Sequence, residues 1–405
     1  MSARHSATRL AVIMCGAETL SMTGFAAYTT LLPLLQREWG LSNSEAGLIG
    51  GIYYAGYVAA TPILTSLTDR IDSRRVYVVA CLISCIGAAG FAWAAQDLLT
   101  ALLFQMLIGI GLGGTYMPGL KMLADQLEGN TQSRAVGFYA ACFGVGSSIS
   151  ILVCGALGAA FGWKWAFAFG ALGPVAAALL VMALMPPGKT RPAHQQGAAL
   201  LDFRPVLKNR KTLPYIIGYA THNYELFGQR TWMVAFLVFC ASLHADGAAL
   251  AGAATLAALI NMMGPVGSIT GNELAMRYGR SRVIFTAMCL SGLMACGLGL
   301  LAGLPLAVVF FIMCVHYTLM LGDSAAMTSG VVAAAPPELR GATMAVYSFV
   351  GFAGAIFAPL VFGVVLDLAG GNQDRTAWWL AFMSIGIFGA LSPLARWLYL
   401  RRTAL

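Results

Sequence analysis

Tyr219-Ala-Thr-His-Asn-Tyr-Glu-Leu-Phe-Gly-Gln-Arg-Thr-Trp232 is a polar stretch in the middle of a long apolar run, residues 213–240. A run of about 20 apolar residues can cross a bilayer as a helix. At 100° per residue, His222, Glu225 and Gln229 fall on one helical face. Ionised side chains are costly at mid-bilayer, so this face must meet other helices or water. It is either a buried structural network or a site for a solute or a proton.

The composition predicts an integral membrane protein. The chain has 405 residues, of which 59% are hydrophobic and only 10% are charged, whereas soluble domains carry about 25% charged residues. A net charge of +8 would suit nucleic acid, but the basic residues lie in short links between apolar runs, so no nucleic-acid partner is expected. The nine cysteines all lie within apolar runs, without C-x-x-C pairs or metal-ligand spacing. Neither a metal site nor a cofactor is therefore expected.

Twelve apolar runs are long enough to be membrane spans. The predicted spans are residues 9–33, 44–68, 76–95, 98–124, 135–161, 166–185, 213–240, 247–275, 283–302, 305–334, 342–368 and 376–398. The basic N-terminal stretch has no convincing cleavage site, which indicates a retained first helix. We expect an all-α protein with an N-terminal six-helix bundle at 1–188, a cytoplasmic loop at 189–212 and a C-terminal six-helix bundle at 213–405.

The distribution of Lys and Arg predicts the orientation in the membrane. With the N-terminus inside, 20 of the 24 basic residues lie in cytoplasmic segments, and only Arg37, Lys164 and Arg375 lie in outer segments. Basic residues are enriched in cytoplasmic loops. Both termini are therefore expected in the cytoplasm, with the chain in a bacterial-type inner (plasma) membrane.

The chain repeats itself at an offset of 207 residues. Asp69-Arg-Ile-Asp-Ser-Arg-Arg-Val76 follows the second span, and Met276-Arg-Tyr-Gly-Arg-Ser-Arg-Val283 follows the eighth. The same offset carries Glu18 in the first span onto Glu225 in the seventh. Both halves start on the same side, so the pattern predicts two parallel repeats about an axis along the membrane normal.

The loops after spans 2 and 8 carry related motifs. Thr65-Ser-Leu-Thr-Asp-Arg-Ile-Asp-Ser-Arg74 keeps the Asp and Arg of the pattern G-x-x-x-D-R-x-G-R-R but replaces both glycines. The second loop keeps Arg277, Gly279 and Arg280, with Met276 at the Asp position. Such a loop is typical of one large transporter family.

Two further loops point to the same family. Gly162-Trp-Lys-Trp-Ala-Phe167 between spans 5 and 6 is similar to G-W-R-W-x-F, and Pro337-Glu-Leu-Arg-Gly341 between spans 10 and 11 is similar to P-x-x-x-R-G. On these four motifs, the chain resembles a member of the major facilitator superfamily along its whole length. The resemblance implies two bundles around a central cavity, lined mainly by spans 1, 4, 7 and 10. It also implies rocking between inward-open and outward-open states.

Two departures from the family's patterns weaken a drug-efflux interpretation. Gln105 stands where the fourth helix of the family often has an Arg linked to proton coupling. Drug antiporters carry G-x8-G-x3-G-P in the fifth helix, and here Gly137 and Gly146 match but Ser150 and Ile151 replace the final Gly-Pro.

Three acids and one histidine are candidates for proton coupling. Glu18, Glu225 and Asp323 lie within predicted spans, where burial disfavours the charged carboxylate. His316 precedes Asp323 by seven residues, so both fall on one face of span 10 and are predicted to pair there. We interpret these four residues as proton-coupling groups; the open alternative for each is a hydrogen-bonded structural role.

The candidate solute-binding residues bring positive and polar groups into the same spans. They are His222, Gln229, Arg230 and Trp232 in span 7, with Tyr116 and Lys121 in span 4. Their positive potential favours an anionic solute. The alternatives are that Arg230 pairs with another helix, that Lys121 forms a local ion pair with Asp125, and that Tyr116 only packs. Asn261 in span 8 is interpreted as a helix–helix hydrogen bond.

The basic loops are candidates for a gate. The family resemblance implies that Asp69, Arg70 and Arg74 form a latch that breaks when the cavity opens inward, with Arg277 and Arg280 in the second copy. The alternative is simple positive-inside charge, which explains the arginines but not the acid among them.

Together these observations favour a secondary carrier. An enzyme is unsupported, because the chain has no H-E-x-x-H, G-x-S-x-G or G-x4-G-K-[ST] motif. We expect a monomer in membrane lipid that takes up a small anion together with protons. The alternatives are proton-driven export of a drug or metabolite, and a membrane sensor that binds without transport.

The orientation leads to a labelling prediction. Single cysteines near Arg37, Lys164 and Arg375, on a background without native cysteines, should react with an impermeant thiol reagent applied outside. Cysteines near Arg204 and Arg280 should stay unlabelled in intact cells and react after lysis. Outside labelling of this second group would overturn the orientation.

Overall fold

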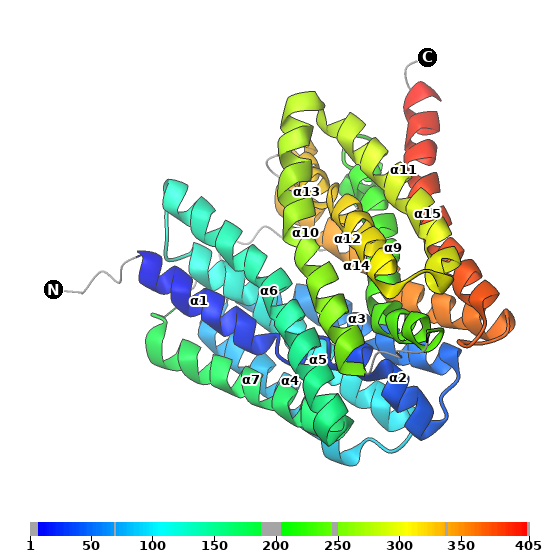
Figure 1. The fold of residues 1–405 in the computed structure, drawn as a ribbon. Coiled ribbons are helices and arrows are strands. Elements are labelled where there is room, and N and C mark those ends of the chain that lie inside the picture. Colours follow the sequence, from blue (N-terminus) through cyan, green and yellow to red (C-terminus); the bar gives the residue numbers. More distant parts are fainter. Residues whose placement is uncertain (1–6, 69, 188–203, 245–249, 337–338, 403–405) are drawn as a thin grey trace. The chain divides into compact units, whose positions relative to one another are not determined.

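The computed structural model describes residues 7–68, 70–187, 204–244, 250–336 and 339–402, and every regular element in these ranges is helical (Figure 1). This agrees with the predicted all-α fold. The long apolar runs explain the helices, because a backbone in lipid must satisfy its hydrogen bonds within its own segment.

The first half of the chain forms seven described helices. They are α1 (Ala7–Ser21), α2 (Ala27–Trp39), α3 (Asn43–Leu67), α4 (Ser73–Ala94), α5 (Leu98–Ala124), α6 (Gly129–Phe161) and α7 (Trp163–Leu184). The first predicted span is therefore broken into α1 and α2. Asp97 and Thr100 form a reciprocal cap at the start of α5, and the hydrogen bonds from the backbone and hydroxyl of Thr100 hold the pKa of Asp97 below its ordinary value.

The second half contains eight described α-helices and one short 3₁₀ helix. They are α8 (Arg204–Lys208), α9 (Leu213–Ser242), α10 (Leu250–Tyr278), α11 (Arg280–Leu298), η2 (Gly299–Gly303), α12 (Leu306–Leu321), α13 (Ser324–Ala334), α14 (Arg340–Leu368) and α15 (Arg375–Arg402). The tenth predicted span is also broken, between α12 and α13.

Nine segments in the described ranges are long and apolar enough to cross a membrane. The other three predicted spans fail that criterion for visible reasons. The first is broken, α9 carries charged residues at its centre, and the described apolar part of α15 ends at Leu391. The structure is thus consistent with twelve spans.

The chain divides into two compact units. Unit 1 comprises Met1–Leu34 and Ile52–Gly197, and unit 2 comprises Leu35–Gly51 and Ala198–Leu405. The end of α2 and the start of α3 therefore group with the second half of the chain. The predicted bundle limits at 1–188 and 213–405 remain a prediction.

Helix boundaries repeat at the offset found in the sequence. The first residues of α4 and α11, Ser73 and Arg280, are 207 apart, as are the last residues of α6 and α14, Phe161 and Leu368. This agreement supports the predicted internal repeat.

The turn before α4 shows why this chain can lack one glycine of the family motif. Asp72 caps α4 by accepting a hydrogen bond from the Arg74 amide at 3.0 Å, whereas the equivalent Gly279 begins α11 with φ +94°, a conformation that favours glycine. A capping carboxylate thus replaces a glycine turn.

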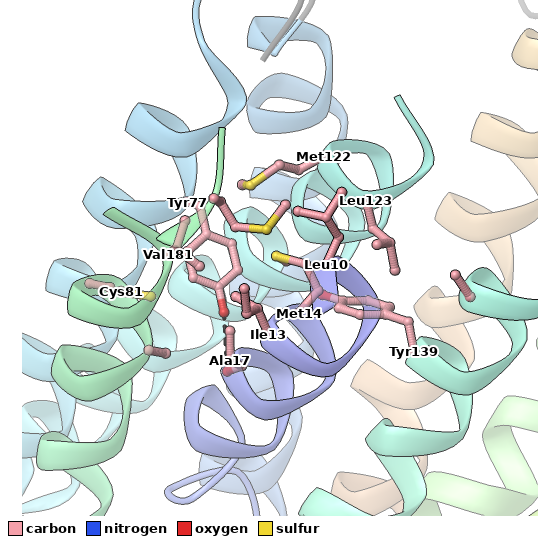
Figure 2. Packing of buried hydrophobic residues seen from close by; sticks show 14 of the residues in the cluster. Leu10, Ile13, Met14, Ala17, Tyr77, Cys81, Met122, Leu123, Tyr139 and Val181 are labelled. Carbon is pink, nitrogen blue, oxygen red and sulfur yellow. Dashed lines mark hydrogen bonds between the residues drawn. The ribbon is translucent and has the colours of Figure 1, made fainter. Parts of the chain in front are cut away.

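Unit 1 has a core in which α1 packs against four other helices. Figure 2 shows Leu10 and Met14 of α1 beside Tyr77 of α4 and Tyr139 of α6. The Tyr77 hydroxyl donates to the Ala17 carbonyl at 3.2 Å, so a buried phenol also finds a partner. This core fixes the α1 turn that carries Glu18.

Unit 2 contains a helix cap supplied from far along the chain. The carboxylate of Asp367, at the end of α14, accepts hydrogen bonds from the Asn43 amide at 3.0 Å, the Asn43 side chain at 2.8 Å and the Ser44 amide at 2.7 Å. The Asn43 and Ser44 amides are orphan donors at the start of α3, so Asp367 caps them from a distance, while the Ser42 hydroxyl accepts from the Glu45 amide at 3.2 Å. Gln36 donates to Asn43 Oδ1 at 2.9 Å and joins α2 to the same cap.

Removing this cap should destabilise the protein. We expect Asp367→Ala to lower the free energy of unfolding by about 1 kcal/mol, the usual cost of losing an N-cap. The measurement is denaturant unfolding of the purified protein in mixed micelles. Glu273→Ala removes an exposed acid from α10 and is the control; equal effects of the two variants would contradict the capping role.

Candidate functional site

Helix α9 presents polar residues that are almost completely buried. His222 and Glu225 are each 2% exposed, and Gln229 is fully buried. The polar face predicted from the sequence therefore lies against other helices, as the cost of placing it in lipid requires.

Two histidine–carboxylate pairs join α9 to the broken tenth span. His316 Nε2 of α12 lies 3.1 Å from Glu225 Oε1. His222 Nδ1 lies 2.8 Å from Asp323 Oδ1, in the turn before α13. All four side chains are at most 3% exposed. We call these residues the crossed pairs, because α9 and the tenth span each contribute one acid and one histidine.

The predicted pairing of His316 with Asp323 is wrong. That prediction assumed a continuous helix, but α12 ends at Leu321 and Asp323 is the N-cap of α13. At the break, the carbonyl of Gly322 lies so close to Gly271 of α10 that a Cβ on Gly271 would clash with it. His316 and Asp323 therefore each contact a residue of α9 and not one another.

Further residues complete the surroundings of Glu225. The Ser291 hydroxyl of α11 donates to Glu225 Oε2 at 3.2 Å, and His316 Nε2 also lies 3.1 Å from the Ser291 carbonyl. Gly389 of α15 leaves room for the Glu225 carboxylate, which a Cβ there would overlap. The sequence interpretation missed Ser291. The signal that could have found it is the repeat, because Ser291 follows the buried Ser84 by 207 residues.

Aromatic rings pack against His222 of the second pair. Tyr219 stacks on His222 with ring centroids 5.9 Å apart, and Tyr347 stacks on Tyr219 at 4.1 Å. The Tyr347 hydroxyl shares a hydrogen bond with Thr328 of α13 at 3.1 Å. The sequence could not predict this stack, because the periodicity of apolar residues does not show which tyrosines contact each other.

Arg230 is held by polar side chains of two other helices. Its Nη2 donates to Asn261 Oδ1 at 2.6 Å and to the Tyr317 hydroxyl at 2.9 Å, and that hydroxyl donates to Asn261 at 2.8 Å. The prediction that Asn261 makes a helix–helix hydrogen bond is confirmed. Of the alternatives for Arg230, contact with another helix is the one observed.

Two other predicted solute-binding residues of α9 have different environments. Neither amide atom of Gln229 has a hydrogen-bond partner within the described part of the chain, so its hydrogen-bonding capacity is unused. Trp232 is fully buried, donates to the Pro359 carbonyl at 3.0 Å and stacks on Phe362. The structure shows Trp232 packed among aromatic rings, and its assignment to solute binding remains a prediction.

Glu18 of unit 1 lies in a tyrosine cluster. Its Oε2 accepts a hydrogen bond from the Tyr139 hydroxyl at 2.8 Å, and it is fully buried. Tyr139 also stacks on Tyr116, with centroids 5.9 Å apart. Glu18 and Glu225 are thus equivalent in position but differ in partner, a phenol in one unit and an imidazole in the other.

Lys121 forms the local contact given as the alternative. Its Nζ lies 3.1 Å from Asp125 Oδ2 and donates to the Thr68 carbonyl at 3.3 Å. The side chain is 26% exposed. The local ion pair near the end of α5 is therefore present, and the assignment of Lys121 to solute binding remains a prediction.

Comparison with known proteins decides the family. The sequence pattern of the Major Facilitator Superfamily matches residues 14–322. The chain belongs to this superfamily. The match confirms the resemblance seen in the motifs, and because the family consists of transporters, the enzyme alternative is excluded.

Two superfamily relatives align over most of the chain. A gallate transporter of Pseudomonas putida is 26% identical over 375 residues, which is 86% of this chain and 82% of the relative. A gentisate transporter of Corynebacterium glutamicum is 24% identical over 416 residues, which is 98% of this chain and 88% of the relative.

Solved structures of the superfamily have the same fold. A bacterial homologue of the human lysosomal transporter Spinster, inward-facing and unoccupied, matches with TM-score 0.79 at 16% identity, covering 98% of this chain and 97% of that one. The nucleoside transporter NupG matches with TM-score 0.77 at 16% identity, covering 96% and 98%. These matches confirm a multi-pass membrane transporter fold.

The structure describes only some of the predicted gate residues. Asp69 lies outside the described residues, so its latch role remains a prediction. Arg74 pairs with Asp72 at 2.8 Å and donates to the Met185 carbonyl at 3.1 Å. Arg70 is exposed, Arg277 lies 5.4 Å from the Tyr278 ring, and Arg280 is partly buried beside Gly330.

No group of three or more His, Cys, Asp or Glu side chains in the described ranges is placed to hold a metal ion.

A double-mutant cycle tests the crossed pairs. Glu225→Gln and His316→Gln should be non-additive, with a coupling of about 0.5–3 kcal/mol, because the two side chains touch. His316→Gln and Asp323→Asn should add within about 0.5 kcal/mol, because their partners differ. The free energy of unfolding in mixed micelles is the quantity measured. Additivity in the first cycle, or equal coupling in both, would contradict the arrangement.

Proposed function

We propose that this superfamily member takes up a small organic anion together with protons, and that aromatic carboxylates are its solute class. The observation that carries the proposal is the burial of two histidine–carboxylate pairs between α9 and the broken tenth span. Intramembrane ionisable residues mark solute and proton pathways by default.

Proton occupancy of a crossed pair determines its charge. With one shared proton the pair is neutral, with two it carries +1, and with none it carries −1. A buried net charge is costly, so a second proton is retained best when an anion is nearby. The anion is in turn bound best when the pair is protonated, since coupling between two ligands is reciprocal. This linkage is what an anion–proton carrier requires.

Two observations support the proposed solute class: the names of the relatives and the buried positive charge of Arg230. Two relatives that align over most of the chain are named for gallate and gentisate transport, and both solutes are aromatic carboxylates. Arg230, positioned by Asn261 and Tyr317, is proposed to attract the carboxylate. Gln229 supplies unused amide groups for a ring hydroxyl.

Glu18 is proposed as a second, weaker proton group. Its partner is the Tyr139 phenol, which does not bind a second proton as an imidazole can, whereas Glu225 lies beside the His316 imidazole. We further propose that the protein works as a monomer in the inner membrane with both termini in the cytoplasm. The 20 basic residues expected on that side support this orientation.

The experiment is gallate and gentisate uptake into proteoliposomes with and without an inward pH gradient. Glu225→Gln keeps the shape of the side chain and mimics its protonated form. It should abolish gradient-driven accumulation but retain solute exchange between the two sides, which moves no net proton. Glu18→Gln should have a smaller effect.

The matched control is Glu273→Gln, the same substitution at an exposed position of α10, which should behave as wild type. Full gradient-driven accumulation by Glu225→Gln would remove this residue from coupling. Accumulation only when the gradient is reversed would favour export, and binding without flux would favour a sensor.

A further inference from the structure

The first span is broken at Met22–Ala26, where the amides of Thr23, Phe25 and Ala27 bond to carbonyls three residues back instead of four. α1 ends at Ser21 and α2 begins at Ala27. In a continuous helix the Ala26 amide would bond to the Met22 carbonyl, and the Ala27 amide to the Thr23 carbonyl. Instead the Ala27 amide bonds to the Gly24 carbonyl at 3.2 Å. This leaves the Thr23 carbonyl and the Ala26 amide outside the helical ladder.

One hydroxyl on α6 satisfies both groups. Ser150 Oγ donates to the Thr23 carbonyl at 2.7 Å and accepts from the Ala26 amide at 3.0 Å. Ser150 is fully buried. A hydroxyl has one donor and two acceptor lone pairs, so it can serve both sides of the break at once. Cys154, one turn later, adds a longer contact of 3.6 Å to the Thr23 carbonyl.

The break is also fixed from the opposite side. Gly24 lies against Gly170 of α7 so closely that a Cβ on either residue would press on the other backbone. The backbone at the break therefore cannot relax toward α7. Its unsatisfied groups depend on Ser150, because buried backbone donors and acceptors need partners.

The same face of α6 also contacts Glu18. Tyr139, which bonds to Glu18 at 2.8 Å, precedes Ser150 by eleven residues, or about three helical turns. Helix α6 thus contacts α1 at Glu18, through Tyr139, and the break after α1, through Ser150. Displacing the break would displace the turn that carries the acid.

The break lies within unit 1, shortly before the chain passes into unit 2. Unit 1 continues to Leu34, and the following residues of α2 group with unit 2. Conformational changes in transporters are absorbed by a few residues at the ends of rigid elements. The segment Met22–Ala26 is such a place, and it directly precedes the helix that runs from unit 1 into unit 2.

We infer that Ser150 is a positioning residue for transport: its hydroxyl holds the first span broken at Met22–Ala26 and so fixes the hinge between α1 and α2. This inference rests on membership of the transporter superfamily and not on the proposed solute. It gives a reason for the departure noted in the fifth span, because the glycine of the drug-antiporter pattern has no hydroxyl with which to make these bonds.

The test is hydrogen exchange of backbone amides, measured by mass spectrometry on protein in lipid nanodiscs. Ser150→Ala should speed exchange of the Ala26 amide by at least about tenfold, the equivalent of one lost hydrogen bond. Ser150→Thr keeps the hydroxyl and should stay within about threefold of wild type. If the Ala variant does not fold, Ser150→Cys, a weaker donor and acceptor, should give an intermediate rate.

The control is Ser384→Ala in α15, whose hydroxyl bonds only to the Ala381 carbonyl of its own helix among the contacts described; it should leave the Ala26 amide unchanged. Unchanged exchange in Ser150→Ala, or equal acceleration in the Ala and Thr variants, would overturn the inference.

A functional measurement separates positioning from simple stability. With gallate as the probe, Ser150→Ala should lower the maximal uptake rate at least about fivefold while changing the half-saturating concentration less than about twofold, because a hinge controls turnover rather than binding. Ser150→Thr should restore the rate. Loss of binding in the Ala variant would contradict the hinge role. If the wild type moves no gallate, the proposed solute class fails, and amide exchange alone decides the role of Ser150.

Discussion

Buried ionisable side chains need polar partners, and this requirement constrains the centre of unit 2. His222 and Glu225 lie one turn apart on α9, and neither can face lipid. Of their partners, His316 lies before the break in the tenth span and Asp323 lies within it. The crossed pairs therefore join α9 to both the helix before the break and the turn that interrupts the span.

The two repeats share helix boundaries, but their helix breaks and buried acids differ. The first span is broken where its counterpart α9 is continuous, and the tenth span is broken where its counterpart α5 is continuous. The breaks are stabilised differently, by a hydroxyl on α6 in unit 1 and by close glycine packing against α10 in unit 2. Glu18 and Glu225 have correspondingly different partners. Duplication explains the common helix register, and divergence of single residues explains the separate roles.

The fold was predictable because apolar length and loop charge are local properties of the sequence. The polar face of α9 and the interhelical role of Asn261 followed from the same reasoning. The partners did not, because helical periodicity orders residues on one helix and cannot say which faces meet. His316 and Asp323 were paired on a continuous helix, but the span is interrupted between Leu321 and Ser324. Trp232 shared the polar face of α9, yet the rings of Phe362 and Trp378 enclose it, which only the packing reveals.

The cap that Asp367 places on α3 has a consequence for biosynthesis. Asp367 follows Asn43 by 324 residues. At roughly 5–20 residues per second, a ribosome needs roughly 15–65 s to make the intervening chain. During that interval the Asn43 and Ser44 amides lack the Asp367 carboxylate, while the local pair of Ser42 and Glu45 can already form. The start of α3 therefore gains its full set of partners only after the end of α14 has been synthesised.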